Sequence, residues 1–85
     1  MSEIDLDRIV DELQTQRDEL RVRLHLLAAD ARDEWEELEK RWEHLRRRAA
    51  VVGHEAKDAG EDVLVATRLV ADELKHGYER LRRLL

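Results

Sequence analysis

The sequence predicts an all-α protein, arranged as a long antiparallel helical hairpin or coiled coil. The 85 residues are 44% charged and 42% hydrophobic, a composition typical of long exposed helices. The chain has no proline and only three glycines, so little in it forces a helix to stop. Apolar residues also recur at steps of three and four over most of the length, which is the spacing of one helix face. A chain of this length forms one domain, spanning residues 1–85.

One continuous apolar stripe runs along the first 52 residues. Leu13, Leu20 and Leu27 recur every seven residues, and the stripe then continues in steps of four and three. Arg17 interrupts it at a position where the repeat calls for an apolar side chain. This pattern is typical of a coiled-coil surface. The apolar stripe consists of Leu6, Val10, Leu13, Leu20, Leu24, Leu27, Ala31, Trp35, Leu38, Trp42, Leu45, Ala49 and Val52.

The order of charges indicates where the helices begin and end. Acidic residues follow Ser2, a good N-cap residue, and arginines at 46–48 precede Gly53. Acids stabilise helix starts and bases stabilise helix ends through the helix dipole. We therefore expect a helix over about 3–52, a turn over about 53–58 and a helix over about 59–84.

Two other layouts are also compatible with the pattern. The apolar phase continues through Gly53 and Gly60, which allows one unbroken helix at a cost of about 1 kcal/mol per glycine. A break near Asp30 is the second alternative, because residues 30–48 repeat the order of acids first and bases last. That break would produce a monomeric three-helix bundle.

In the hairpin, the second helix is too short to cover the first. A helix over 3–52 is roughly 75 Å long and one over 59–84 about 40 Å. Leucines between residues 6 and 24 would stay uncovered, and so long an apolar stripe is rarely left in water. We therefore expect a second copy to cover it in a homodimer, parallel or antiparallel. In the three-helix alternative the same residues are buried within one chain.

Two further features of the first helix have a structural and a functional interpretation. Trp35 and Trp42 lie seven apart and share a face, which indicates core residues or, alternatively, an anchor for a partner or a lipid. A basic cluster is interpreted as helix-end electrostatics, with attraction of an acidic partner or phosphate as the alternative. The basic cluster consists of Lys40, Arg41, His44, Arg46, Arg47 and Arg48.

The chain offers little chemistry for catalysis or for a cofactor. It has no cysteine, no glycine-rich phosphate loop and no base placed beside a serine or threonine. Glu73 and His76 form an E-x-x-H pair, which ferritin-like bundles use to bind metal, and the hairpin would set Glu36 and Glu39 opposite. Such pairs arise easily in a glutamate-rich helix, so we interpret them as a solvated charged face. We expect no enzyme activity and no cofactor.

The charge balance and the N-terminus bear on partners and location. A net charge of −5 argues against nucleic acid and against anionic membrane surfaces. The acidic N-terminus does not resemble a secretory signal, and the apolar runs are too short to span a bilayer. We therefore expect a cytoplasmic protein.

The alternation of acidic and basic blocks resembles the exchangeable amphipathic helices of apolipoproteins. The stretch from Ala56 to Leu85 is similar in style to small bacterial coiled-coil proteins. This resemblance implies binding to lipid surfaces, although the proline-punctuated repeats of apolipoproteins are missing. The expected function is a non-enzymatic, self-associating structural or protein-interaction module, with lipid-surface binding as the alternative and metal binding as a remote one.

Overall fold

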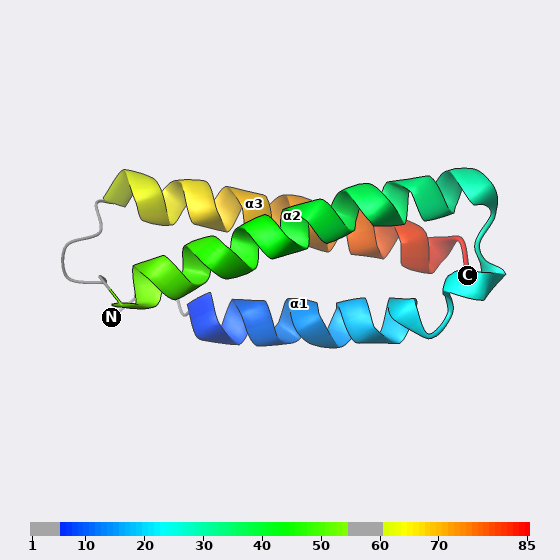
Figure 1. Ribbon diagram of the computed structural model, residues 1–85, viewed down its shortest axis with the longest axis horizontal. Helices are drawn as coiled ribbons and strands as arrows, with labels where there is room; N and C mark the ends of the chain where they lie inside the picture. Colours follow the sequence, from blue (N-terminus) through cyan, green and yellow to red (C-terminus); the bar gives the residue numbers. More distant parts are fainter. Residues whose placement is uncertain (1–5, 55–60) are drawn as a thin grey trace.

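Three α-helices packed side by side form the part of the protein that the structure describes (Figure 1). The computed structural model describes residues 6–54 and 61–85, with side chains over 6–51 and 63–85. Neighbours in the chain run in opposite directions, so the first and third α-helices point the same way. The all-α prediction is confirmed. The elements are α1 (Leu6–Arg21), the short 3₁₀ helix η1 (Leu24–Leu26), α2 (Ala29–His54) and α3 (Glu61–Arg83).

The continuous first helix expected over 3–52 is wrong, because the chain reverses direction at residues 22–28. The N–H of Leu26 donates to the carbonyl of Arg23 at 2.9 Å, in the tighter three-residue pattern of a 3₁₀ turn. Leu27 then adopts an extended backbone, with φ −88° and ψ 146°. The layout broken near Asp30, a three-helix bundle, is therefore the one that the chain adopts. We call residues 22–28 the hinge.

Apolar burial explains why the chain reverses without a glycine or proline. The reversal lets Leu13 and Leu20 of α1 lie buried in one core with side chains of α2 and α3 of the same chain. Each buried leucine contributes about 1.5–3 kcal/mol. A helical hydrogen bond contributes only about 0.5–1.5 kcal/mol. The 3₁₀ turn replaces some of the helical hydrogen bonds that the reversal breaks. Tertiary packing thus outweighs the local preference for an unbroken helix.

Local hydrogen bonds complete the start of α2. The guanidinium of Arg32 donates through Nε to the carbonyl of Leu27 at 3.1 Å. The carboxylate of Asp30 accepts from the N–H of Ala31 at 2.9 Å, and its charge lies in the first turn, where the helix dipole favours it. The acid that begins the charge pattern of residues 30–48 therefore marks a true helix start.

The second reversal lies close to its predicted position. α2 continues through Gly53 to His54, and α3 begins at Glu61. Most of the expected turn over 53–58 lies outside the described residues, which stop at 54 and resume at 61. α3 packs along α2 in the opposite direction, so the alternative of one unbroken helix through both glycines is wrong.

The core is a single layer of large side chains between α2 and α3, with α1 closing one side. The rings of Trp35 and Tyr78 approach to 6.2 Å between centroids. Leu45, Leu74 and Leu81 are fully buried. One packed layer is all that a bundle of three slender helices can enclose, so each of these side chains is expected to matter for stability.

Replacing one of these leucines should destabilise the bundle strongly. Leu74→Ala is expected to lower the free energy of unfolding by about 2–5 kcal/mol, because it leaves a cavity in the only core layer. Leu69 lies on the same helix and is 57% exposed, so Leu69→Ala is the matched control, with a change of about 0.5 kcal/mol or less. Urea unfolding followed by circular dichroism measures both. Equal losses would contradict the assignment of the core face of α3.

Gly77 permits the closest approach of α3 to α2. A Cβ at this position would overlap the Cδ2 of Leu38, a side chain that is 1% exposed and packed in the core. Glycine inside a helix normally costs about 1 kcal/mol relative to alanine. Here the close packing of the two helices offsets that cost.

Gly77→Ala should therefore destabilise the protein although alanine favours helices. The overlap should lower the stability of the protein by about 1–3 kcal/mol, which exceeds the gain in helix propensity. In a Leu38→Ala background the overlap is absent, so Gly77→Ala should become stabilising by up to about 1 kcal/mol. Thermal or urea unfolding of the four proteins in this cycle measures the sign change. A change of the same sign in both backgrounds would show that Leu38 does not limit the size of the side chain at position 77.

Candidate functional site

The apolar stripe expected to hold two copies together forms the core of a single chain. Of its other members, Val10, Leu24 and Ala49 are half-buried, and the side chain of Val52 lies outside the described residues. The uncovered leucines between 6 and 24, on which the expectation of a homodimer depended, are thus covered within the chain. Nine members are buried: Leu6, Leu13, Leu20, Leu27, Ala31, Trp35, Leu38, Trp42 and Leu45.

Both tryptophans are core residues. Trp35 is 7% exposed and Trp42 is 3% exposed. Trp35 packs on Tyr78, and the guanidinium of Arg17 lies 5.7 Å from the ring centroid of Trp42. Neither indole is available on the surface as an anchor for a partner or a lipid in this arrangement.

Arg17, which interrupts the apolar stripe, is paired across the α1–α2 contact. Its Nε and Nη2 donate to the two carboxylate oxygens of Glu39 at 2.6 and 2.8 Å, a bidentate geometry. The hydrogen bond with Glu39 is the main cause that raises the pKa of Arg17 above its usual value. The interruption is therefore a specific link that fixes α1 on α2. The sequence shows the unusual arginine but not its partner.

Tyr78 is the one described buried side chain whose polar atom lacks a hydrogen-bond partner. Its hydroxyl is buried, and its ring packs with the ring of Trp35. Burial, with a smaller contribution from the nearby Glu39 carboxylate, raises the pKa of Tyr78 well above its usual value. The phenol therefore stays protonated and acts as an apolar ring in the core.

The four weak metal-binding candidates are not brought together. Glu36, Glu73 and His76 are exposed, and Glu39 is engaged by Arg17. Within the described residues, no three His, Cys, Asp or Glu side chains are grouped so that they could hold a metal ion. The packing that sets Glu39 against α1 is a consequence of the hinge, which the hairpin layout did not include.

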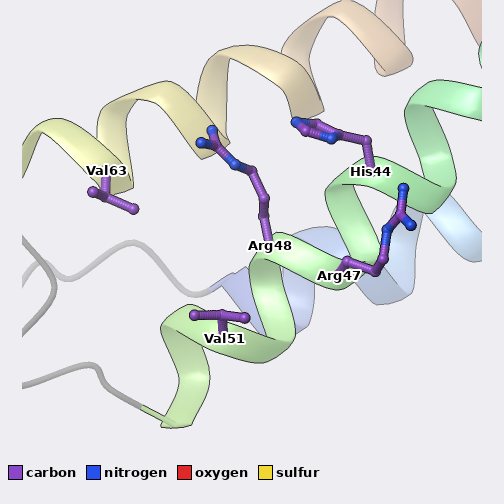
Figure 2. A pocket seen from close by; sticks show the side chains of 5 residues that line it. All are labelled: His44, Arg47, Arg48, Val51 and Val63. Carbon is purple, nitrogen blue, oxygen red and sulfur yellow. The ribbon is translucent and has the colours of Figure 1, made fainter.

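The feature best suited to binding is a groove where α2 and α3 separate, at the end of the bundle opposite the hinge. Figure 2 shows His44 and Arg48 extending from α2 toward α3, with Val51 and Val63 further along the two helices. The groove has a volume of about 370 Å³ and is open to solvent. We call it the basic groove; it is lined by His44, Arg47, Arg48, Val51 and Val63.

The arginines of the basic groove are not explained by helix-end electrostatics. Arg48 lies six residues before the last residue of α2, whereas the dipole effect falls off within the last turn. Arg46 reaches Glu43 at 3.6 Å, but Arg47 and Arg48 form no ion pair with a described carboxylate. Their charge is thus left without a described carboxylate partner beside two valines.

The valines are the second unusual component of this groove. Val51 is 58% exposed and Val63 is 42% exposed, and they line the same groove from the two different helices. The arginines stand out in the sequence but the valines do not, because only the packing of α3 on α2 brings residue 63 to the same groove as residue 51. An apolar surface flanked by cations is a typical composition for a binding site.

Comparison with known proteins adds no assignment. The sequence matches no protein-family model, and no curated protein or solved structure is significantly similar to it. The resemblance to apolipoprotein-type helices remains a prediction. None of the described helices is long and apolar enough to cross a bilayer.

The Arg17–Glu39 link should show a measurable coupling energy. In a double-mutant cycle, Arg17→Met and Glu39→Gln are expected to couple by about 1–2 kcal/mol, because the arginine side chain is only 16% exposed and the pair is bidentate. Arg82 and Glu19 join α3 to α1 at 2.9 Å but are 57% and 55% exposed. The matched cycle Arg82→Met with Glu19→Gln should give about 0.5 kcal/mol or less. Equal coupling in both cycles would contradict a special role for Arg17.

Proposed function

We propose that this chain is a non-catalytic protein-interaction module whose basic groove binds an acidic, amphipathic segment of a partner protein. The observation that carries the proposal is the pairing of two exposed valines with two arginines that no described carboxylate neutralises. The valines offer apolar area that a partner would remove from water. The arginines offer planar donors that match carboxylates.

A helix is the form of partner that suits this groove. The groove is bordered by two helices, and a third helix laid along them would bury one apolar face while its flanking carboxylates meet the arginines. Helix-in-groove recognition of this kind depends on a few apolar anchors spaced by three or four residues. Val51 and Val63 are the surfaces on which such anchors would rest.

Charge argues against a second copy binding groove to groove. A twofold interface places the same patch of both chains face to face. Arg47 and Arg48 would then meet the same arginines of the second copy, and like charges in contact cost several kcal/mol. An acidic partner removes this repulsion and replaces it with attraction.

The hydroxyl groups of the two described threonines support a non-catalytic role. The hydroxyl of Thr67 is buried and donates to the carbonyl of Val63 at 2.8 Å. The hydroxyl of Thr15 donates to the carbonyl of Asp11 at 3.1 Å. A nucleophilic hydroxyl requires a neighbouring base instead of a backbone carbonyl. These two side chains serve helix structure.

Charge reversal in the groove tests the proposal. The probe is a fluorescein-labelled helical peptide with leucines on one face and glutamates beside them, and fluorescence anisotropy measures its binding. Arg47→Glu with Arg48→Glu should weaken binding at least about tenfold, which corresponds to about 1.4 kcal/mol. Arg21→Glu with Arg83→Glu makes the same charge change at the hinge end and is the matched control, with binding close to that of the unchanged protein.

Other outcomes of this experiment have definite meanings. Equal weakening by both pairs, or equal binding of a peptide with lysines in place of glutamates, would contradict a specific acidic site. Vesicles of phosphatidylcholine with phosphatidylserine test the lipid alternative. Flotation with these vesicles that depends on Arg47 and Arg48, without peptide binding, would replace the protein partner with a membrane surface.

A further inference from the structure

We infer that two copies of this chain exchange α1, so that the hinge straightens and α1 and α2 become one helix whose α1 part packs on the partner copy. The inference is independent of the acidic partner proposed above. It is carried by three observations: the backbone of the hinge, the apolar stripe that continues through it, and the exposed apolar side chains around it. In the exchanged dimer, each half repeats the three-helix bundle with α1 supplied by the other copy.

The backbone of the hinge contains nothing that requires a turn. Residues 22–28 include no glycine and no proline, and no described residue has a positive φ. The reversal is made by 3₁₀ hydrogen bonds and by the extended backbone at Leu27. Every one of these residues is able to adopt helical dihedral angles, so the hinge is free to open into a helix.

The apolar stripe continues through the hinge in the phase of a single helix. Leu20, Leu24 and Leu27 follow in steps of four and three, and Ala31 continues the series on α2. A chain selected only for the closed reversal has no need to keep this phase across the break. The straight helix would carry the stripe unbroken from α1 into α2, which is the pattern that predicted a long first helix.

Exposed apolar side chains gather at the hinge end of the bundle. Val22 is 72% exposed and Leu26 is 63% exposed. The C-terminus lies at the same end, where Leu84 is 65% exposed and Leu85 is 41% exposed (Figure 1). When the hinges straighten, the two bundles lie end to end with these ends facing. The exchanged dimer therefore places this apolar surface at the junction, where the second copy covers it.

Exchange preserves the contacts that hold α1 in place. The Arg17–Glu39 and Arg82–Glu19 pairs, and the burial of Leu13 against the core, are formed between copies instead of within one. The closed monomer and the exchanged dimer thus differ chiefly at the hinge, so protein concentration selects between them.

Crosslinking distinguishes exchange from every other arrangement. The chain has no cysteine of its own, so Glu19→Cys with Arg82→Cys places two thiols at an exposed α1–α3 contact, within reach of the short linker bismaleimidoethane. The protein is refolded at micromolar and at millimolar concentration before treatment. We expect crosslinks within one chain at low concentration. At high concentration we expect crosslinks between chains, with the mass doubling from 10.1 kDa on a denaturing gel.

Two hinge variants shift the equilibrium between the closed monomer and the exchanged dimer in opposite directions. Ala28→Pro suits the closed form, because Leu27 already has the extended backbone favoured before proline, and it interrupts a straight helix. It should abolish crosslinks between chains while the melting temperature of the monomer stays unchanged. His25→Ala raises helix propensity in the hinge and should increase the fraction of crosslinks between chains at a given concentration.

Two results would overturn the inference. One is a dimer by light scattering whose crosslinks stay within each chain, which indicates side-by-side association without exchange. The other is a monomer at every concentration with the unchanged hinge. Because both results come from the protein with its natural hinge, the test remains decisive even if Ala28→Pro does not fold.

Discussion

Two helices, α1 and α2, both bury their apolar residues against the same helix, α3, and this packing determines the structure. The stripe on α1 and α2 is continuous in the sequence, whereas α3 is the one further α-helix among the described residues that can cover it. The chain resolves this by reversing at the hinge, so that both halves of the stripe meet the side of α3 that carries Leu74, Tyr78 and Leu81. The close α2–α3 contact at Gly77 and the pairing of Arg17 with Glu39 both follow from this packing.

Composition and periodicity were sufficient to predict helical structure, the stripe, the end of α2 and both ends of α3, because these depend on local spacing and charge. They did not predict the reversal at the hinge. No residue between Val22 and Ala28 disfavours a helix, and the reversal is stabilised by leucines that lie far from it in α1. Local signals favoured one long helix, and non-local burial, which a single pattern of spacing does not contain, decided against it.

The candidate site, too, was predictable from local sequence signals only in part, and packing decided the rest. The arginines near the end of α2 stand out in the sequence as a charge cluster, but their neighbours there suggested a helix end. Only the extension of α2 to His54 and the position of Val63 on the adjoining helix turn them into part of a groove. The two ends of the bundle consequently differ: one presents cations with valines in a groove, and the other presents the hinge, with exposed apolar side chains and arginines. Exchange of α1 would leave a basic groove at each far end of an elongated dimer, where two sites can act together.

Small-angle X-ray scattering of the dilute protein tests the central claim most directly, because it measures whether one chain covers its own stripe. The three-helix bundle has a radius of gyration of 13.9 Å over its Cα atoms, so the account predicts a compact monomer close to this value. An unbroken helix from residue 6 to residue 54 would be about 74 Å long, with a radius of gyration of roughly 21 Å. A value near the larger figure for the dilute monomer would contradict the reversal at the hinge and the core built on it.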